Sequence, residues 1–323
     1  MSFILTEEQE ELLALVRKFS EKEILPYAHQ MDVEAHFVPG LIQKIADLGF
    51  MGINVPEEYG GVGADEVTKA LVIMEFAKYD ASVAELLAVH TLSSDIILKH
   101  GTPEQKEKYL TKACTGAVGA FALTEPNAGS DAAAAKTKAI SQGDEYIING
   151  SKCFISNMGQ DEGDYVILIV LTDPEKKTKG MSAIIVDRDT PGFTVPKTED
   201  KMGLRAAPVS ELYFDECHVP KSQLLGEEGK GFAIAMAGLD GGRIGMASQA
   251  VGLAESCISE SVEYSTQRVQ FGKPVNANQG LQWYLADMAT KTEAAKALNY
   301  STQKTMRIAQ QLYEGVDIEG HGT

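Results

Sequence analysis

The sequence predicts an α+β protein of three parts: an N-terminal helical domain over residues 1–117, a central β domain over 118–223 and a C-terminal helical domain over 224–323. Three observations predict this fold class. Apolar residues recur at helical spacing in the first third, short aliphatic and aromatic runs between turn residues fill the middle, and helical spacing returns after Leu225. Strands and helices do not alternate, which disfavours a doubly wound nucleotide-binding fold.

The N-terminal part is predicted to be helical from its caps and its apolar spacing. Thr6 and Gln9 match a capping box at the start of the first helix. A second capping box joins Thr102 to Gln105, with Pro103 at the first helical position, where its missing N–H does no harm. Between these two helices, further helices are predicted over about 41–48, 66–79 and 84–99.

The middle part is predicted to be a compact β domain. Its apolar runs are short, and several are bounded by Gly, Pro, Asn or Asp, as is typical of strands. The runs cover residues 120–123, 146–148, 153–155, 165–171, 181–186 and 211–214.

The C-terminal part is predicted to form two long helices of a four-helix bundle. Five glycines weaken the prediction for the first helix, because each costs about 1 kcal/mol against alanine in a helix interior. Small residues on one helix can also mark a close approach of the backbone to a ligand or partner. The glycines are Gly238, Gly241, Gly242, Gly245 and Gly252, and the apolar positions are Phe232, Met236, Leu239, Leu281, Leu285 and Met288.

Composition and charge exclude several function classes. The chain has 29 Lys and Arg against 46 Asp and Glu, a net charge of −17, so we expect neither nucleic acid nor a membrane surface as a partner. No apolar run approaches the ~20 residues of a membrane span. The N-terminus shows no signal-peptide pattern, so we expect a cytoplasmic protein. The cysteines and histidines lack metal-ligand spacing, so we expect no metal site.

The segment 121–131 is the densest candidate for a binding site. A β-type run breaks at Pro126 into a loop that contains Gly129, Ser130 and Asp131. Such a loop offers backbone N–H groups and hydroxyls to an anionic or heteroaromatic ligand. On residue chemistry alone, a plain turn at the end of a strand is the commoner explanation.

This segment resembles the flavin-binding signature of the acyl-CoA dehydrogenase family. The resemblance implies that its backbone and hydroxyl groups hold the isoalloxazine and pyrophosphate of FAD. It also implies that Ser130 approaches the acyl-CoA substrate. The residues implied in cofactor binding are Phe121, Ala122, Leu123, Thr124, Gly129 and Ser130.

A second segment, residues 149–157, is similar to the strand that covers the flavin in that family. By resemblance, Phe154 shields one side of the ring, Ile155 is the aliphatic residue beside it, and Ser156 donates to the flavin N5 atom. The stretch 201–215 looks like the family's last β hairpin.

Two segments of the C-terminal part complete the resemblance. Asp240 and Arg243 stand in a stretch similar to the helix start that engages the acyl-CoA. Arg268, Phe271 and Gln279 stand in a stretch similar to the segment that reaches the FAD of a neighbouring subunit. The resemblance covers nearly the whole chain, and the ordered matches are specific together although each is weak alone.

The general base of the family has no match here. In most members it is a Glu on a Tyr-Glu-Gly loop in the second half of the C-terminal bundle. Tyr313-Glu314-Gly315 copies the tripeptide, but it follows Arg268 too closely to be that loop. A minority branch places the base on the first bundle helix, where this sequence has Gly242. We therefore expect no catalytic residue in this chain, and we expect its C-terminal helical domain to be truncated.

The resemblance implies an FAD-dependent oxidoreductase of fatty acid metabolism, closest to the short-chain, butyryl-CoA dehydrogenase-like branch. Its reaction is α,β-dehydrogenation of a short-chain acyl-CoA, or the reverse enoyl-CoA reduction, with electrons exchanged with electron-transfer flavoprotein. The implied assembly is a homotetramer, a dimer of dimers. Because loss of a positioned base typically lowers rates by about 10²–10⁴-fold, we expect poor activity and weak FAD binding. The alternatives are a non-catalytic fragment that binds flavin or acyl-CoA, and a flavin monooxygenase on the same scaffold.

Overall fold

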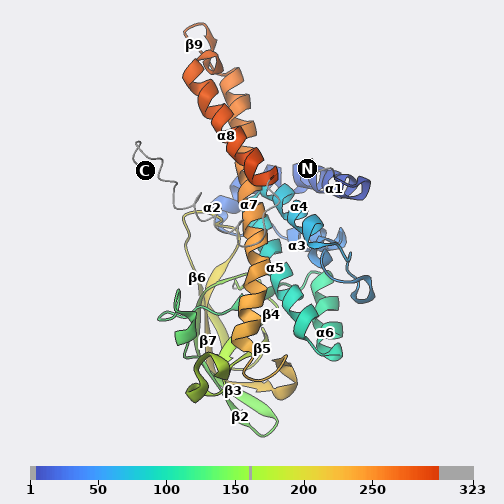
Figure 1. The fold of residues 1–323 in the computed structure, drawn as a ribbon, viewed down its shortest axis with the longest axis vertical. Coiled ribbons are helices and arrows are strands. Elements are labelled where there is room, and N and C mark those ends of the chain that lie inside the picture. The colour runs from blue at the N-terminus through green and yellow to red at the C-terminus, as the bar shows by residue number, and fades with distance from the viewer. Residues whose placement is uncertain (1–4, 160–161, 298–323) are drawn as a thin grey trace. The chain divides into compact units, whose positions relative to one another are not determined.

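The computed structural model describes residues 5–159 and 162–297 of the chain. Its elements follow the predicted order of helices, then strands, then helices (Figure 1). The predicted fold class is therefore confirmed. Tyr313, Glu314 and Gly315 lie outside the described residues.

Contacts group the described residues into two compact units. Residues 27–69 and 85–242 form the first, which we call the sheet unit. Residues 5–26, 70–84 and 243–297 form the second, which we call the bundle unit. The domain boundaries expected from the sequence stay predictions.

The helices of the sheet unit begin where local sequence signals place them. At the N-terminus of α6, Thr102 Oγ1 accepts from the Gln105 N–H (3.2 Å), and Gln105 Oε1 accepts from the Thr102 N–H (3.0 Å). This reciprocal pair is the predicted capping box, with Pro103 at the first helical position. The helices here are α2 (Ala28–Glu34), α3 (Leu41–Asp47), most of α5 (Ala81–His100) and α6 (Pro103–Cys114).

Among the described residues, α5 is the one helix long and apolar enough to cross a membrane, judged by length and composition alone. Of its most apolar window, 78% is buried inside the fold. A core helix of a folded domain passes the same test, so this finding does not assign a membrane span.

An eight-stranded sheet forms the centre of the sheet unit. Its order is β6-β7-β3-β2-β4-β5-β8, with β1 also paired to β4. Strands β1 and β2 run parallel to β4, and the other pairs are antiparallel. The strands are β1 (Gly119–Ala122), β2 (Lys138–Gln142), β3 (Glu145–Ser156), β4 (Tyr165–Leu171), β5 (Met181–Asp187), β6 (Phe193–Thr198), β7 (Val209–Pro220) and β8 (Leu224–Leu225).

The core lies on both faces of β4. Val166, Leu168 and Val170 belong to a cluster built within the sheet, whereas Ile167 and Ile169 belong to a cluster that includes side chains of α5 and α6. Alternate residues of a strand point to opposite faces, so a strand covered on both sides is a continuous apolar run. The apolar run predicted over these residues is therefore a central strand.

Helix α7 forms despite the five glycines that weaken its prediction from the sequence. Helix α7 is continuous over 37 residues. Its Gly252 lies so close to α4 that a Cβ there would stand 2.0 Å from the Met74 carbonyl oxygen. This glycine therefore permits close helix packing. The helices of this unit are α1 (Glu7–Glu23), the end of α4 (Glu66–Ala77), α7 (Gly231–Gln267) from residue 243, and α8 (Gln279–Ala297).

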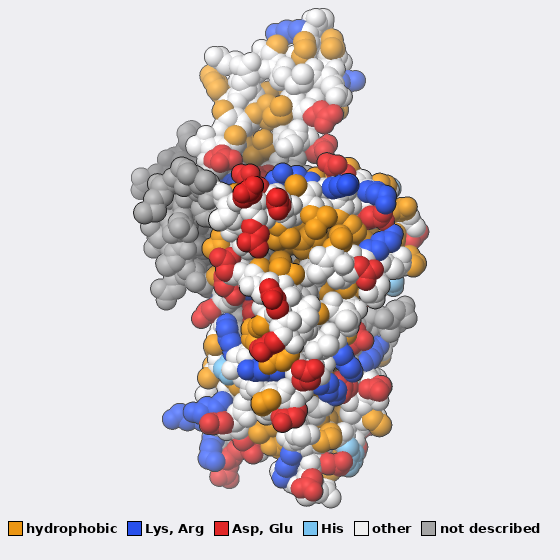
Figure 2. All heavy atoms as spheres, turned by 90° about the vertical axis from the view of Figure 1, so that its right-hand side faces the viewer, with side chains coloured by type: hydrophobic (Ala, Val, Ile, Leu, Met, Phe, Trp, Pro, Cys, Tyr) orange, Lys and Arg blue, Asp and Glu red, His pale blue; other side chains and the backbone are white. Residues whose placement is uncertain are grey.

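The surface carries charges of both signs. On the face shown in Figure 2, acidic and basic side chains of the described residues are interspersed with apolar ones. Several large apolar side chains are exposed, and two of them, Phe154 and Phe271, lie in segments that the sequence singles out.

Candidate functional site

The first predicted segment lies at the carboxyl end of β1. Ala122 and Leu123 are buried, while Phe121 and Thr124 are half-buried. Parallel pairing with β4 sets Ala122 opposite Leu168. The pairing of β1 with β4 therefore fixes the backbone at the point where the chain leaves the sheet.

The chain after Thr124 folds into a tight turn. The Glu125 N–H donates to the Ala128 carbonyl (3.2 Å), and the Ala128 N–H donates to the Glu125 carbonyl (3.0 Å). Gly129 and Ser130, which follow this turn, are exposed. Exposed N–H groups and a hydroxyl beside a closed turn can donate to a phosphate or to a heteroaromatic ring.

The second predicted segment lies directly against the first. The Cys153 N–H of β3 donates to the Thr124 carbonyl, with an N···O distance of 3.0 Å. This backbone hydrogen bond joins the end of the first segment to the strand that carries Phe154. The structure therefore brings together the two stretches that the resemblance assigns to one ring.

Phe154 occupies a bulge in β3. The pairing of β3 with β7 shifts between Lys152, opposite Leu212, and Ile155, opposite Ser210. At this bulge Phe154 has a φ of +57°, and it is 66% exposed, whereas Ile155 is buried. Left-handed backbone costs a non-glycine residue about 1–2 kcal/mol. Such strain and exposure together are typical of a ring that faces a ligand.

The end of β3 is tied to α5 and to β1. Ser156 Oγ donates to Glu85 Oε1 (3.2 Å) on α5. Asn157 is fully buried, and its Nδ2 donates to the carbonyls of Leu86 (2.9 Å) and Gly119 (3.3 Å). The Ser156 hydroxyl thus already has an acceptor within this chain.

A buried histidine holds the start of β1. The Gly119 N–H donates to His90 Nδ1 (3.2 Å), which leaves His90 Nε2 to donate to the Met51 carbonyl (2.9 Å). Burial lowers the pKa of His90 from 6.5 to about 4, so the ring is neutral near neutral pH. A neutral ring is what the acceptor role at Nδ1 requires.

A buried ion pair lies at the other end of β1. Lys152, whose side chain is 0% exposed, places Nζ 2.8 Å from Glu125 Oε1 and 3.0 Å from the Leu123 carbonyl oxygen. The Glu125 carboxylate also accepts from the N–H groups of Lys136 (2.6 Å) and Thr137 (3.0 Å). The sequence predicted no role for Lys152 or Glu125. A lysine among the apolar residues of a predicted strand could have indicated a buried ion pair.

The environment shifts both pKa values of this pair. Burial by itself raises the pKa of Glu125, but the charge of Lys152 and the hydrogen bonds hold it below its usual value. Burial lowers the pKa of Lys152, against the opposing attraction of Glu125. Lys152 and Glu125 thus lie in direct contact inside the fold, and each favours the charged form of the other against the cost of burial.

The predicted substrate residues of the C-terminal part lie on α7. Asp240 is exposed and Arg243 is half-buried. Just before them α7 runs close to α5, because a Cβ on Gly238 would stand 2.7 Å from Ile96 Cδ1. The glycine spacing thus marks a contact with α5 at this point.

The remaining predicted cofactor residues lie in the bundle unit, at the hairpin between α7 and α8. Arg268, Phe271 and Gln279 are all exposed. Strands β9 (Val269–Gln270) and β10 (Lys273–Pro274) pair as a short antiparallel ladder. Phe271 sits in the turn between them with a φ of +51° and is 101% exposed.

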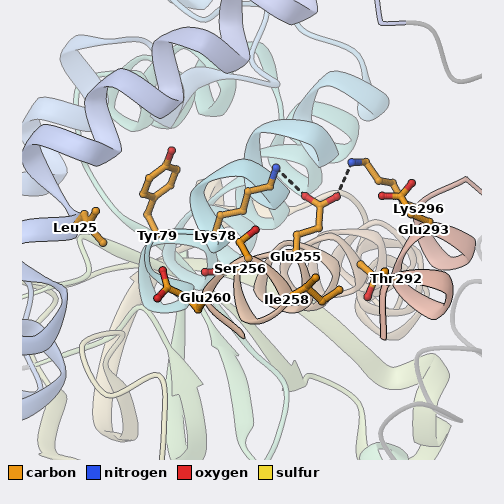
Figure 3. A pocket seen from close by; sticks show the side chains of 12 residues that line it. Leu25, Lys78, Tyr79, Glu255, Ser256, Ile258, Glu260, Thr292, Glu293 and Lys296 are labelled. Atoms are coloured by element: carbon orange, nitrogen blue, oxygen red, sulfur yellow. Dashed lines mark hydrogen bonds and ion pairs between the residues drawn. The ribbon is translucent and has the colours of Figure 1, made fainter. Parts of the chain in front are cut away.

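A separate cavity of about 520 Å³ lies within the bundle unit and contains none of the predicted site residues. Figure 3 shows Glu255 between two lysines, with Lys78 Nζ at 2.7 Å and Lys296 Nζ at 2.5 Å from its carboxylate. Burial by itself raises the pKa of Glu255, but these two partners hold it below its usual value. Both lysines that line this cavity are thus already paired with Glu255.

The groups gathered at β1 and β3 suit a flavin dinucleotide. They combine one exposed aromatic ring, the hydroxyls of Thr124 and Ser156, and the exposed backbone at Gly129 and Ser130. A metal ion would need a different donor set. Within the two described stretches, no group of three or more His, Cys, Asp or Glu side chains could hold one.

Family models match three consecutive stretches of the chain. They are described as the N-terminal domain of acyl-CoA dehydrogenase over residues 6–117, its middle domain over 120–217 and its C-terminal domain over 229–316.

Individual relatives agree with these matches. The acryloyl-CoA reductase (NADH) of Anaerotignum propionicum is 50% identical over 301 residues, which cover 92% of this chain and 76% of the reductase. The solved butyryl-CoA dehydrogenase of Megasphaera elsdenii is 44% identical with a TM-score of 0.89, over 96% of this chain and 82% of that one. A chain in a structure described as the electron transferring flavoprotein of Acidaminococcus fermentans is 44% identical with a TM-score of 0.90, over 98% of this chain and 81% of that one.

Proposed function

The chain belongs to the acyl-CoA dehydrogenase family, and on that premise we propose that it binds FAD and acts on a short-chain acyl-CoA. The proposed reaction is α,β-dehydrogenation of the thioester or the reverse reduction of an enoyl-CoA. Electrons are exchanged with electron-transfer flavoprotein. When bound, FAD supplies the two-electron redox chemistry that protein side chains lack.

One observation carries this proposal: the hydrogen bond from the Cys153 N–H to the Thr124 carbonyl, which joins the two proposed flavin segments. Because of this join, the exposed Phe154 ring and the Thr124 hydroxyl lie on neighbouring segments. An aromatic face can stack against a flat ring system, and hydroxyls and N–H groups can donate to its heteroatoms. The residues present therefore fit the cofactor.

The proposed cofactor contacts divide by chemistry. Hydroxyl and backbone donors for the ring and pyrophosphate come from the β1 end and the turn, and β3 supplies apolar cover and the hydroxyl of Ser156. The hairpin residues contribute to the FAD of a neighbouring subunit in a dimer of dimers. In order, these residues are Phe121, Ala122, Leu123, Thr124, Gly129 and Ser130; Phe154, Ile155 and Ser156; and Arg268, Phe271 and Gln279.

The proposed substrate contacts are Ser130, Asp240 and Arg243. A guanidinium pairs well with phosphate, so Arg243 suits the charged part of coenzyme A. The exposed hydroxyl of Ser130 stands beside the proposed flavin turn and suits a polar group of the substrate. Ser130 and Arg243 supply local donors in a chain whose net charge is −17, and the Asp240 carboxylate supplies an acceptor.

No described residue is assigned as the general base that removes the Cα proton. Gly242 stands where a minority branch of the family carries that carboxylate, and glycine has no side chain to accept a proton. Turnover is therefore the property that separates the proposed dehydrogenase from the alternative, a protein that binds flavin or acyl-CoA without converting the thioester.

Two relatives support the redox partner and the two possible directions. The relative from A. propionicum is named a reductase of acryloyl-CoA, and the structure from A. fermentans is described as an electron transferring flavoprotein. A cytoplasmic location remains a prediction for this chain.

Flavin titration followed by substrate addition tests the proposal. The chain is titrated with FAD, and quenching of flavin fluorescence gives the dissociation constant. Butyryl-CoA is then added without oxygen, and the visible flavin absorbance is followed. Saturable binding with bleaching supports the dehydrogenase, and binding without bleaching supports the alternative. A chain that is folded by circular dichroism yet shows no saturable flavin binding contradicts the dehydrogenase and the flavin-binding form of the alternative.

A further inference from the structure

The buried pair Lys152–Glu125 is a costly feature that the proposed chemistry does not use. Lys152 is fully buried in β3, and lysine is almost never fully buried unless it is paired. Replacing a buried ion pair by apolar residues is often neutral or stabilising, so the pair is not explained by stability alone. Its contacts indicate what else it does.

Those contacts converge on three consecutive residues. Lys152 Nζ donates to the Leu123 carbonyl (3.0 Å), the neighbouring Cys153 N–H donates to the Thr124 carbonyl (3.0 Å), and Glu125 forms the ion pair (2.8 Å). Two adjacent residues of β3 thus hold the backbone of Leu123 and Thr124 and the side chain of Glu125. This is the point at which the proposed flavin turn leaves the sheet.

Glu125 also fixes the chain that follows the turn. Its carboxylate accepts from the N–H groups of Lys136 and Thr137, and its backbone closes the turn with Ala128. The loop from 125 to 137 is thereby closed at its two ends by one buried side chain.

We propose that Lys152 and Glu125 are positioning residues for the flavin: their ion pair, with the bond from Lys152 to the Leu123 carbonyl, fixes the backbone that presents Thr124, Gly129 and Ser130 to the cofactor. The inference rests on the proposed FAD site. Neither side chain touches the cofactor, and both act through the turn. Groups that bind a ligand must be held by supporting bonds, and loose support lowers affinity without removing any contact residue.

The chain offers a matched control in a second buried pair. Lys69 Nζ lies 2.6 Å from Asp95 Oδ2, and their side chains are 5% and 12% exposed. Their further hydrogen bonds reach Asn54 and Glu66 in the helical part of the same unit. Breaking this pair disturbs a buried charge without freeing the proposed flavin turn.

The test compares four variants of the full chain: Lys152→Met, Lys152→Met with Glu125→Gln, Lys69→Met, and Lys69→Met with Asp95→Asn. Three quantities are measured: the Tm without cofactor, the Kd for FAD by fluorescence quenching, and the visible circular dichroism of bound flavin, which reports ring orientation. Lys152→Met is expected to lower the Tm and raise the Kd by about tenfold or more, because the supporting shell of the turn is lost.

The double variant at the site separates positioning from stability. It leaves no unpaired buried charge, so most of the lost Tm is expected to return. The Kd is expected to stay raised and the flavin dichroism to stay altered, because the Leu123 carbonyl still lacks its donor. Lys69→Met is expected to lower the Tm, and Lys69→Met with Asp95→Asn is expected to recover most of it for the same reason. In both Lys69 variants the Kd is expected to stay within about twofold of the unaltered chain, because their pair supports no flavin contact.

Two results overturn the inference and leave the proposed function standing. In the first, both the Tm and the Kd for FAD return to their original values in Lys152→Met with Glu125→Gln. In the second, the Lys69 variants lose as much FAD affinity as the Lys152 variants do when the two sets have lost the same Tm. If the chain without substitutions is folded and binds no FAD, the proposed function is overturned, and this inference with it. Should Lys152→Met fail to fold, the double variant decides the question alone.

Discussion

Two phenylalanines present exposed rings on left-handed backbone, one in each compact unit, and their surroundings differ. Phe154 (φ +57°) stands in the twelve-residue strand β3, beside the bond from Cys153 to Thr124. Phe271 (φ +51°) stands in a turn between two strands of two residues each. The first ring is 66% exposed and the second 101%.

The difference separates a pre-formed part of the proposed site from a part that needs a partner surface. Buried groups hold the surroundings of Phe154, so its backbone keeps its geometry without a ligand. Among the described residues, a short hairpin holds Phe271, and its ring is fully exposed. An aromatic ring offers a large apolar contact area once a partner covers it. This contrast fits the proposal that the hairpin contacts the FAD of a neighbouring subunit.

The largest effect we expect is a loss of stability in acid, which tests whether buried groups hold the Phe154 side. The pKa of His90 is about 4 in the fold and about 6.5 when unfolded. Between these values the unfolded chain binds a proton that the folded chain does not, so the free energy of unfolding falls as the pH falls. We expect His90 to cost about 2 kcal/mol at pH 5 and about 3 kcal/mol at pH 4, relative to pH 7. Urea denaturation across this range measures the loss.

The matched control is His90→Gln, whose amide can accept from Gly119 and donate to Met51 without titrating. It is expected to flatten the dependence between pH 4 and 6.5. His100, whose pKa is also lowered by burial, remains in both proteins, so its share cancels. An unchanged slope in the variant would show that burial does not lower the pKa of His90 as described.

Local signals explain how much of the fold could be predicted. Thr6 with Gln9, and Thr102 with Gln105, predicted helix starts to the residue, because a capping box depends on groups within one turn. Strands β2 and β6 were missed because they carry few apolar residues. The separate runs predicted over 146–148 and 153–155 belong to one strand, β3, because Gly150 pairs opposite Phe214 and the ladder continues past a register shift after Ile148.

Contacts distant in sequence explain what could not be predicted. The two proposed flavin segments each carry a local motif, so each could be found alone. The partners Lys152 and Glu125 are 27 residues apart, and only the pairing of the sheet reveals that they meet. Likewise, the glycines of α7 count against a helix by propensity, and only the packed structure shows that Gly252 admits a neighbouring carbonyl.

A pair of variants at Phe154 is expected to have the next largest effect. Phe154→Ala removes the ring and keeps the strained backbone, so FAD affinity is expected to fall by about 10–100-fold, in line with the ~1–3 kcal/mol of aromatic stacking. Phe154→Gly removes the ring and also relieves the strain, so the same loss of affinity should come with a gain in apoprotein stability of up to about 1 kcal/mol. Flavin titration and urea denaturation measure the two quantities. Equal stabilities in the two variants would argue against stored strain at the bulge.

The smallest effect is expected at Phe271, and it tests whether the hairpin ring contributes to FAD binding only in an oligomer. Phe271→Ala removes a fully exposed ring, so the free energy of unfolding should stay within about 0.5 kcal/mol of the unaltered chain. FAD affinity should fall by a few-fold only at protein concentrations where sedimentation velocity shows an oligomer, because the ring is proposed to reach a neighbouring subunit's cofactor. Phe271→Tyr keeps the ring and is the matched control. If Phe271→Ala weakens FAD binding by the dilute monomer as strongly as Phe154→Ala does, the hairpin belongs to its own chain's pre-formed site and the contrast between the two rings fails.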